Sequence, residues 1–437
     1  MPSKPQRYSE RGQTIILVAI SIVSLLAMAA LAIDVVTLYV ARSEIQRAAD
    51  AAALAGAKAM ADSGLTTLPT TDSNFSGGAA QTLAQSMAVS AVNALLPNNT
   101  VAGLAPTLQS VPTFNFTTSV STPINNPQVT VSLRRTDLPT FFAHIFGRTA
   151  ATVSASATAE AYNPANASGS FTPISPRGVK PWLVANLDPI QSGNAFITAG
   201  AVEAQTIGET FYLTADCGVG RTCVPPDNPP KVTKVGGKSE LEYLPALVIP
   251  NTSNVCPACV GGRDFEQAIS CYDANPYAYL NCGGGATNAQ WDNTVNPQGR
   301  GRHHQTEDGT LCLIHATDEG GPGSNSGQDS LNDSLWPTQP MQITSASTGN
   351  LVTTSRSVVT IPIFDQTTFN VASSSVTIVG YLQAFINYVS DGTDGSNPDD
   401  VNITILNVVG CGTNYSAAPA IVGGSGTSPI PVRLITP

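Results

Sequence analysis

Residues 14–33 read TIILVAISIVSLLAMAALAI, a run of 20 residues that carries no charge and is followed by Asp34. About 20 apolar residues are needed for a helix to cross the hydrocarbon core of a bilayer, so the run predicts a transmembrane helix bounded by Thr14 and Ile33. A cleaved secretory signal is the alternative interpretation, but the apolar core of such a signal is usually about 7 to 15 residues long. The length of the run therefore favours an anchor.

The charges before this run set its expected orientation. Lys4, Arg7 and Arg11 are opposed only by Glu10. Because basic residues collect on the cytoplasmic side of a membrane helix, residues 1–13 are predicted to lie in the cytoplasm. The chain is then a single-pass protein of the cytoplasmic (inner) membrane, whose body after the helix is periplasmic or extracellular.

The composition of the whole chain agrees with an exported body. Of the 437 residues, 11% are charged and 42% are hydrophobic, and the formal net charge is −10. The hydrophobic fraction is large enough to build cores, so a folded body is expected. An acidic chain lacks the positive field that holds nucleic acid phosphates, so nucleic acid is not expected as a partner.

The membrane helix is predicted to continue far beyond the membrane. No proline occurs between Thr14 and Gly64, and Gly56 is the one glycine in that interval, so a helix over 14–62 would be about 70 Å long. Small residues that lie on one face of this helix let other helices approach closely, although alanine is also the best helix former for a solvated stalk. The expected packing face consists of Ala48, Ala52, Ala55 and Ala59.

An α+β unit is predicted around the second half of this helix. A second amphipathic helix over 80–96 ends at Pro97, and a strand over 128–133, a short helix after Pro139 and a strand over 149–161 follow. The residues expected on the core side of the second helix are Leu83, Met87, Val89, Leu95 and Leu96.

Four stretches of this part are distinctive. They are Arg11-Gly12-Gln13, the Ala-Ile-Asp exit at 32–34, IQRAADAAALAGA at 45–57, and FFAHIFG from residue 141 with the alternating ATVSASATAEA after it. Together they resemble the N-terminal module of TadE/TadG-like Flp pilus-assembly proteins. The resemblance implies a pilin-like module in a bitopic envelope protein that assembles or anchors a type IVb, Flp-type pilus. The implied partners are the lipid bilayer and other pilus-assembly or pilin-like membrane proteins, contacted through the N-terminal helix.

Two features of that family are missing from the sequence. Many TadG-like proteins carry a von Willebrand factor A domain with a metal-dependent adhesion motif of the Asp-x-Ser-x-Ser kind, which this chain lacks, so its adhesive function is not implied. Prepilin-like members are processed after a glycine that has glutamate at the fifth position beyond it. The fifth position after Gly12 is Leu17, so the resemblance does not imply cleavage by a prepilin peptidase.

Residues 163–340 are rich in Asn, Gly, Pro and Thr and hold seven of the eight cysteines. An even number of cysteines, all beyond the membrane run, favours disulfides in an oxidising envelope, but the spacing leaves roughly a hundred connectivities open. The candidates are Cys217, Cys223, Cys256, Cys259, Cys271, Cys282, Cys312 and Cys411.

The Cys256-x-x-Cys259 spacing also suits zinc, and three histidines lie downstream, at positions 303, 304 and 315. A complete zinc pattern needs a second close pair, and the separation of Cys271 from Cys282 is too wide for one. Disulfides are therefore the favoured interpretation of these cysteines.

Residues 341–437 return to a β pattern. Strands are predicted over 357–364, 376–389 and 401–409, between turns rich in Gly, Asn and Asp. The acidic turn DGTDGSNPDD at 391–400 offers the oxygen ligands that calcium prefers, although its spacing misses the EF-hand loop and such turns are usually only solvated. The calcium candidates are Asp391, Asp394, Asp399 and Asp400.

The expected fold class is α+β: a cytoplasmic N-terminus (1–13), a transmembrane helix (14–33), a pilin-like α+β module with an Ala-rich helix (34–162), a loop-rich disulfide region (163–340) and a β-rich C-terminal domain (341–437). The sequence carries no nucleophile elbow, zinc-protease motif, phosphate loop or dinucleotide fingerprint, so we expect no catalytic residues and no cofactor.

Two functional hypotheses follow from these features. The first is a non-enzymatic envelope protein that assembles or anchors a Tad/Flp-type pilus. The alternative is a surface-exposed binding module or adhesin, for calcium or a glycan, that uses the N-terminal module only as an anchor.

Overall fold

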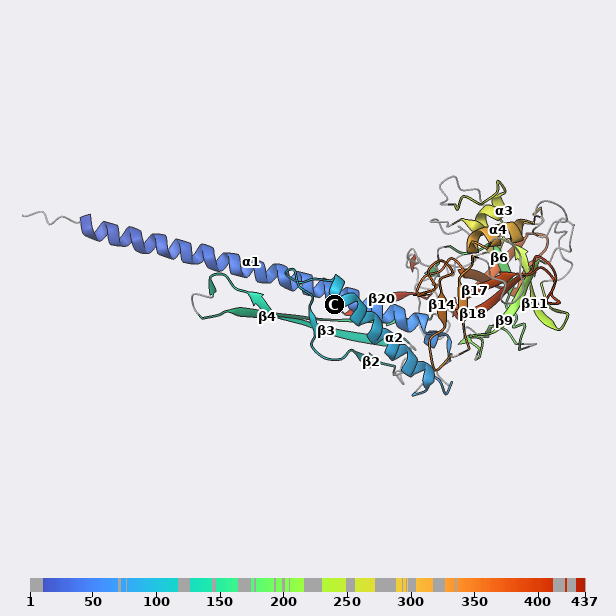
Figure 1. Ribbon diagram of the computed structural model, residues 1–437, viewed down its shortest axis with the longest axis horizontal. Coiled ribbons are helices and arrows are strands. Elements are labelled where there is room, and N and C mark those ends of the chain that lie inside the picture. Colours follow the sequence, from blue (N-terminus) through green and yellow to red (C-terminus); the bar gives the residue numbers. More distant parts are fainter. Residues whose placement is uncertain are drawn as a thin grey trace, which may run out of the picture.

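The computed structural model shows a long N-terminal helix, an elongated α+β module packed along its second half, and a β-barrel at the far end (Figure 1). The structure describes residues 11–69, 72–75, 77–116, 126–143, 147–163, 174–176, 178–191, 194–198, 201–203, 205–215, 230–248, 256–271, 288–292, 294–295, 297, 304–316, 327–334, 336–411, 421–422 and 430–436.

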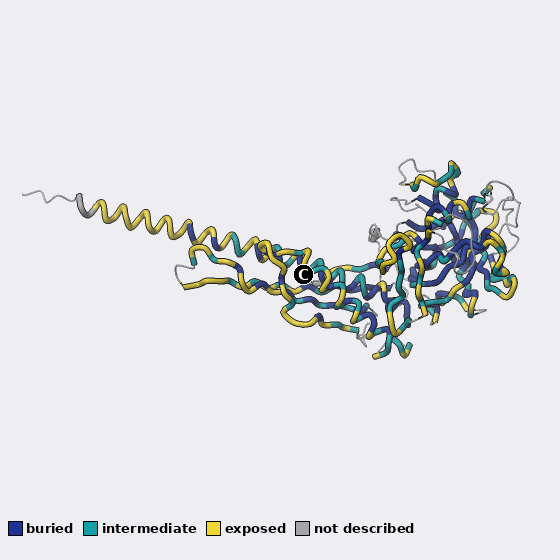
Figure 2. The backbone as a smooth tube through the Cα atoms, viewed as in Figure 1, coloured by how far each residue is buried: buried dark blue, intermediate teal, exposed yellow. Residues whose placement is uncertain are grey.

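A single helix, α1, runs from Arg11 to Asp62, which confirms the prediction of an unbroken helix. Its first half is exposed around its whole circumference, whereas its second half is partly buried (Figure 2). Burial begins at Ala30 and Asp34 and becomes regular from Ala41 onward. The helix therefore consists of a bare apolar half and a half that belongs to a folded module.

The second half of α1 packs against a helix and a five-stranded antiparallel sheet. The sheet has the order β1-β3-β4-β20, and β2 pairs with the same strand as β1, namely β3. These elements are α2 (Ala79–Leu95), β1 (Thr107–Leu108), β2 (Thr113–Asn115), β3 (Gln128–Pro139), β4 (Ala150–Ala161) and β20 (Val432–Thr436), with the 3-10 turns η1 (Leu65–Thr67) and η2 (Leu96–Asn98).

Small side chains line the contact between α1, α2 and this sheet. A Cβ on Gly56 would lie 3.1 Å from a methyl of Val129 and 3.3 Å from a methyl of Val92, so the elements approach closely there. The core face of α2 accordingly differs from the predicted one. Leu83 is buried as expected, but the other predicted residues are only half-buried, because the narrow space accepts small side chains. The buried residues of α2 are Ala80, Leu83, Ala84, Ala88 and Val92.

The far end of the molecule is built on an eight-stranded sheet with the order β10-β11-β6-β16-β17-β18-β9, with β12 beside β17. A further parallel pairing of β11 with β9 closes six of these strands into a barrel. The strands are β6 (Trp182–Ala185), β9 (Thr210–Ala215), β10 (Val232–Val235), β11 (Lys238–Pro245), β12 (Asn288–Gln290), β16 (Val358–Asn370), β17 (Ser375–Val389) and β18 (Val401–Gly410).

Alternate residues of the barrel strands form one buried cluster that fills its interior, for example Ile361 in β16 and Ala384 in β17. Two short helices, α3 (Asp264–Ser270) and α4 (Gln305–Ile314), pack against this cluster. Phe265 of α3 and Leu313 of α4 are part of it. Small pieces complete this part: β5 (Ile174–Ser175) with β19 (Ile421–Val422), β7 (Ile197–Thr198) with β8 (Ala201–Val202), and β13 (Ser330–Asn332), β14 (Gln342–Thr344) and β15 (Leu351–Val352).

The barrel and the membrane-proximal module are joined by a buried seam. Ala61 at the end of α1 and Ala161 at the end of β4 share a cluster with Tyr381 on the outside of the barrel. The Asn163 amide donates to the carbonyls of Thr66, 3.1 Å away, and Val408, 2.8 Å away. After leaving the barrel, the chain returns to the module, where β20 pairs with β4.

The α+β fold class is confirmed, as are the three predicted C-terminal strands, which correspond to β16, β17 and β18. The barrel takes strands from both sides of position 340, where the sequence suggested a domain boundary. Strand β3 is longer than predicted and runs to Pro139. The short helix expected after Pro139 falls partly on residues 144–146, which lie outside the described residues; the other residues of FFAHIFG, 141–143 and Gly147, are described.

Candidate functional site

The bare half of α1 is the first candidate surface. From Thr14 onward the helix is long and apolar enough to cross a membrane, as an anchor or as a signal sequence. Ile33 is exposed at the end of the predicted span, and Asp34, the next residue, is 4% exposed. The exposed large apolar side chains are Ile15, Ile16, Leu17, Val18, Ile20, Ile22, Val23, Leu25, Leu26, Met28, Leu31, Ile33, Val35, Val36, Tyr39 and Val40.

Asp34 is held by the tip of the β3–β4 hairpin. Its carboxylate accepts three backbone N–H groups: from Phe141 at 2.9 Å, from Phe142 at 3.0 Å and from Ala143 at 2.6 Å. The tip is closed locally by Arg148, whose N–H donates to the carbonyl of Ala143 at 3.1 Å. We call this arrangement of Asp34 and residues 141–143 the Asp34 clamp.

The clamp has a clear electrostatic cause. The N–H of Ala143, with those of Phe141 and Phe142, holds the pKa of the Asp34 carboxyl below its usual value, because these donors favour the charged form. A carboxylate at the end of an apolar run is thus satisfied by the peptide backbone. Sequence reasoning singled out both partners, the Ala-Ile-Asp exit and the Phe-Phe stretch, but it could not pair residues that lie 107 positions apart.

The predicted small-residue face of α1 lies inside the module. Ala48 and Ala52 are buried in the core that α1 shares with α2, β3 and β4, and Ala55 and Ala59 are half-buried. This face therefore contacts other parts of the same chain, and the surface that α1 leaves open to other molecules is its apolar first half.

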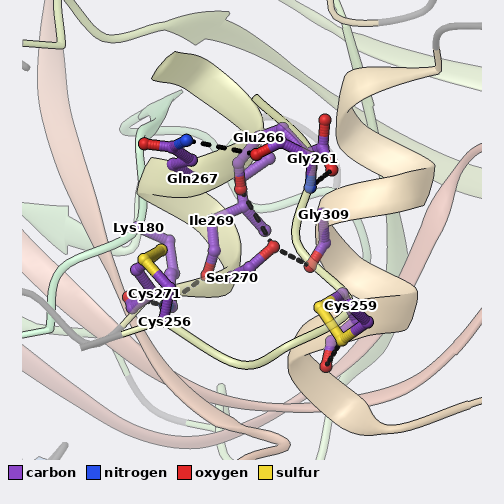
Figure 3. The surroundings of a disulfide bond; sticks show 11 residues. Lys180, Cys256, Cys259, Gly261, Glu266, Gln267, Ile269, Ser270, Cys271 and Gly309 are labelled. Atoms are coloured by element: carbon purple, nitrogen blue, oxygen red, sulfur yellow. Dashed lines mark hydrogen bonds between the residues drawn. A yellow bond between two sulfur atoms is a disulfide. The ribbon is translucent and has the colours of Figure 1, made fainter. Parts of the chain in front are cut away.

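The cysteines of the Cys-x-x-Cys pair form two disulfides with separate partners. Cys256 is bonded to Cys271, and Cys259 is bonded to Cys312 (Figure 3). Because both sulfurs are used in disulfides, the zinc interpretation of this pair is wrong. Cys411 is disulfide-bonded as well. The remaining candidates, Cys217, Cys223 and Cys282, lie outside the described residues.

These disulfides tie α3 and α4 to a loop in a tightly packed region. The Ser270 hydroxyl, in α3, donates to the carbonyl of Gly309, in α4, at 2.9 Å (Figure 3). A Cβ on Gly309 would lie 3.0 Å from the carbonyl oxygen of Glu266, so the two helices touch at backbone level. The buried ammonium of Lys180 donates to the carbonyl of Ile269, near the C-terminal end of α3, where a positive charge is favourable.

The four calcium candidates have different partners. Asp391 accepts from Thr393, and Asp394 accepts from the hydroxyls of Tyr212 and Tyr388. Burial alone would raise the pKa of Asp394, but hydrogen bonds from Ser396 and the tyrosines hold it well below its usual value. The buried Asp400 shares a hydrogen bond with Glu240. Calcium binding in this loop remains a prediction.

The fourth candidate, Asp399, belongs to a cluster with His304 and Glu307. The ring Nδ1 of His304 lies 2.6 Å from Asp399 and 3.2 Å from Glu307. Burial, and then the charge of Asp399, raises the pKa of Glu307 to about 7. Within the described residues, this is the one group of three His, Cys, Asp or Glu side chains whose ligand atoms, all within 4.8 Å of one another, could hold a metal ion.

A cavity of about 860 Å³ lies where the module meets the barrel. Residues far apart in the sequence line it, including Met87 of α2, Trp336 and Met341. Its lining is largely apolar, with Lys58 and Arg356 among the charged residues.

Comparison with known proteins identifies one part of the chain. Residues 12–59 match the model of the family described as "Putative Flp pilus-assembly TadE/G-like", so the chain carries a TadE/G-like domain over α1. That domain indicates a role in Flp pilus assembly. No curated protein matches the chain, and no solved structure does. The matched segment begins one residue after α1 begins and ends three residues before it ends.

Proposed function

We propose that this protein is a non-enzymatic, membrane-anchored envelope component that assembles or anchors a Tad/Flp-type pilus. One observation carries the proposal: the TadE/G-like match covers the helix whose first half is apolar and exposed and whose second half is the spine of a folded module. The first half of such a helix needs a lipid or protein environment, because exposing so large an apolar surface to water is unfavourable.

The same architecture assigns each part of the chain to the cytoplasm, the bilayer or the space beyond it. Residues 14–33 span the bilayer, and the basic residues of the N-terminus, Lys4, Arg7 and Arg11, hold that end in the cytoplasm. From Asp34 to Asp62 the helix rises about 42 Å, so the module holds the barrel that far from the membrane surface. The barrel is thereby presented to other pilus-assembly or pilin-like proteins, while the anchor stays in the lipid.

The function is tested first at the level of the anchor. The full chain, carrying an epitope tag at its C-terminus, is expressed in a cell that makes Flp-type pili, and the membranes are washed with alkaline carbonate. We expect the chain to remain in the membrane pellet with its N-terminal residues intact, and added protease to reach the body only from outside. A soluble body that begins near Asp34 would instead identify residues 14–33 as a signal sequence.

The pilus role is tested by complementation. A strain without this chain should lose its surface pili, and the wild-type chain should restore them. A chain whose residues 11–33 are replaced by a cleavable secretory signal should export the body and fail to restore pili. Normal piliation of the strain without the chain would overturn the proposal.

The cavity between module and barrel favours a second candidate function, a surface-exposed binding module. Leu351 and Val352 of β15 line it together with Trp336. Filling it with a Val352→Trp substitution should leave piliation unchanged if the first proposal holds alone. Loss of surface attachment with intact pili would support the binding module.

A further inference from the structure

We propose that residues 141–143, which follow β3, and the first turns of α1 beyond Asp34 lie together in the headgroup region of the membrane leaflet that faces the body. We call this surface the membrane collar, and it consists of Val35, Val36, Tyr39, Val40, Phe141 and Phe142. The inference rests on the proposed anchor and goes beyond it, because it places part of the folded module in the lipid.

The height of the hairpin tip follows from the Asp34 clamp. Residues 14–33 as a helix are about 30 Å long, which matches the hydrocarbon core of a bilayer. Asp34 then lies where the headgroup region begins. Since the Asp34 carboxylate accepts the N–H groups of Phe141 and Phe142 directly, the backbone of the tip lies at the same height as Asp34. Figure 1 shows the hairpin running along α1 toward the bare half of that helix.

The side chains at the tip suit that environment. Phe141 is 61% exposed and Phe142 is 36% exposed, although hairpin tips in water are usually built from Gly, Asn and Asp. Arg148, close to the tip, is exposed as well, and a cation there fits the phosphates of lipid headgroups. Aromatic and basic residues are typical of the zone between hydrocarbon and water.

The surface of α1 continues the same pattern. Val35, Val36 and Val40 are exposed on the helix just beyond Asp34, and Tyr39 is 76% exposed. These residues extend the apolar surface by about 10 Å beyond the predicted span, which is enough to cross a headgroup layer about 5 to 8 Å deep. Apolar side chains are therefore exposed at the height of Asp34 both on α1 and at residues 141–142, and a lipid headgroup layer, which surrounds the helix, can contact both at once.

The membrane collar should restrict how far the body tilts relative to the membrane helix. A single membrane helix leaves the body free to tilt, whereas a second contact beside the helix restricts that tilt. The Asp34 clamp fixes the tip to the helix, so the module and the span move as one body. We therefore expect the barrel to be held at a defined height above the membrane.

Tryptophan fluorescence in lipid vesicles tests the inference on the full chain. Three variants are reconstituted in vesicles of phosphatidylcholine and phosphatidylglycerol: Phe141→Trp in the tip, Leu25→Trp in the span and Val111→Trp as the matched control. Val111 is 72% exposed and lies between β1 and β2, about 25 Å farther along β3 than the tip. The native tryptophans Trp182, Trp291 and Trp336, all beyond the module in sequence, give the background signal.

Lipids with bromine near the headgroup end of the acyl chain should quench roughly half of the added Phe141→Trp emission, and lipids with bromine near the chain terminus should quench it less. Leu25→Trp should show the reverse order, and Val111→Trp should match the wild-type chain. If Leu25→Trp is quenched and Phe141→Trp is not, the anchor stands and the collar is overturned. If Leu25→Trp is not quenched, the anchor itself fails. Quenching of Val111→Trp would also overturn the collar, since the body would then lie on the lipid as a whole.

Discussion

At the scale of single residues, Asp34 is the contact that fixes the hairpin to α1. Asparagine at this position has one acceptor oxygen in place of two, and its NH₂ group would face a backbone donor. We expect Asp34→Asn to raise the hydrogen-exchange rate of the amides at 141–143 by roughly tenfold, because at least one donor loses its acceptor. Exchange measured by mass spectrometry in detergent micelles reports this directly.

The control for this variant is Asp50→Asn, where the carboxylate accepts from Gln46 on the same helix and not from the tip. It should leave exchange at the tip unchanged. The pKa of Asp34 is lowered, so the clamp is at full strength above the ordinary carboxyl pKa near 4 and weakens only as the pH falls below it. Equal exchange at the tip in Asp34→Asn and wild type would contradict the clamp.

Glu209 is a second residue whose ionisation should change the stability of the fold with pH. Burial, with the charge of Asp188 nearby, raises its pKa to about 7. The folded chain therefore keeps a proton that the unfolded chain has released, so stability falls as the pH rises from about 4.5 to 7 and is level above that. Glu209→Gln should remove this fall and raise stability near pH 8 by about 1 kcal/mol, a value reduced for the exposed part of the group. Thermal unfolding at a series of pH values tests it, and an unchanged pH profile would refute it.

At the scale of elements, much of the fold could be predicted, for physical reasons that also explain the failures. The span, the unbroken helix and the three long C-terminal strands have strong periodicity or β-branched runs. The larger apolar residues of α2 do not predict its core face, because the side chains that the narrow contact accepts are mainly alanines, which carry little hydrophobic signal. The end of β3 was missed because its residues beyond Leu133 alternate poorly and several are exposed.

The close approach of α1 to its neighbours predicts a strong size effect at Gly56. Valine there would place two methyl groups against Val92 and Val129, which are already within contact distance of a Cβ. We expect Gly56→Val to destabilise the module by about 2 kcal/mol through overpacking. Ser43→Val, on the exposed side of the same helix, controls for the helix propensity of valine. Hydrogen exchange in α1 and α2 should increase in the first variant and not in the second.

The lengths of the loops that the two disulfides close predict how much each bond contributes to the free energy of unfolding. The Cys259–Cys312 bond closes a loop of 53 residues and the Cys256–Cys271 bond one of 15. Removing them by paired Cys→Ser substitutions should cost about 4 and about 3 kcal/mol, respectively, because longer loops lose more entropy on closure. Denaturant unfolding followed by fluorescence measures both. Free alkylation of Cys256 or Cys259 without reductant would show that the bonds do not form.

At the scale of the whole molecule, the sequence could not show which distant strands pair with one another. The barrel closes through the pairing of β11 with β9, and β20 leaves the barrel to join the sheet of the module. Such long-range pairings leave no local pattern in the sequence. The same is true of the Asp34 clamp, whose partners were both recognised as distinctive stretches but not as neighbours. Truncation after residue 340 would remove three barrel strands, so point substitutions are the sharper tools for separating the functions of module and barrel.

Asn163 joins the module to the barrel, because its side-chain amide bonds to backbone groups on both sides of the seam. It is 1% exposed, its amide donates to the carbonyls of Thr66 and Val408, and its oxygen accepts from the N–H of Gly410 at 3.2 Å. Asn163→Asp would place a carboxylate against two carbonyls that need donors, at a cost of about 3 kcal/mol.

The seam should then open before the barrel unfolds, and Trp336 reports the event because its indole N–H donates to the carbonyl of Ser63 across the same seam, at 3.0 Å. We expect the emission of Trp336 to shift to the red in Asn163→Asp at denaturant concentrations that leave the wild-type chain unchanged. Asn93→Asp, an exposed substitution of the same type on α2, should behave as the wild type. If Asn163→Asp unfolds in one step at the wild-type midpoint, the seam does not depend on this amide, and other contacts across it, such as the hydrogen bond from the Thr67 hydroxyl to Asn407 at 3.2 Å, hold module and barrel together.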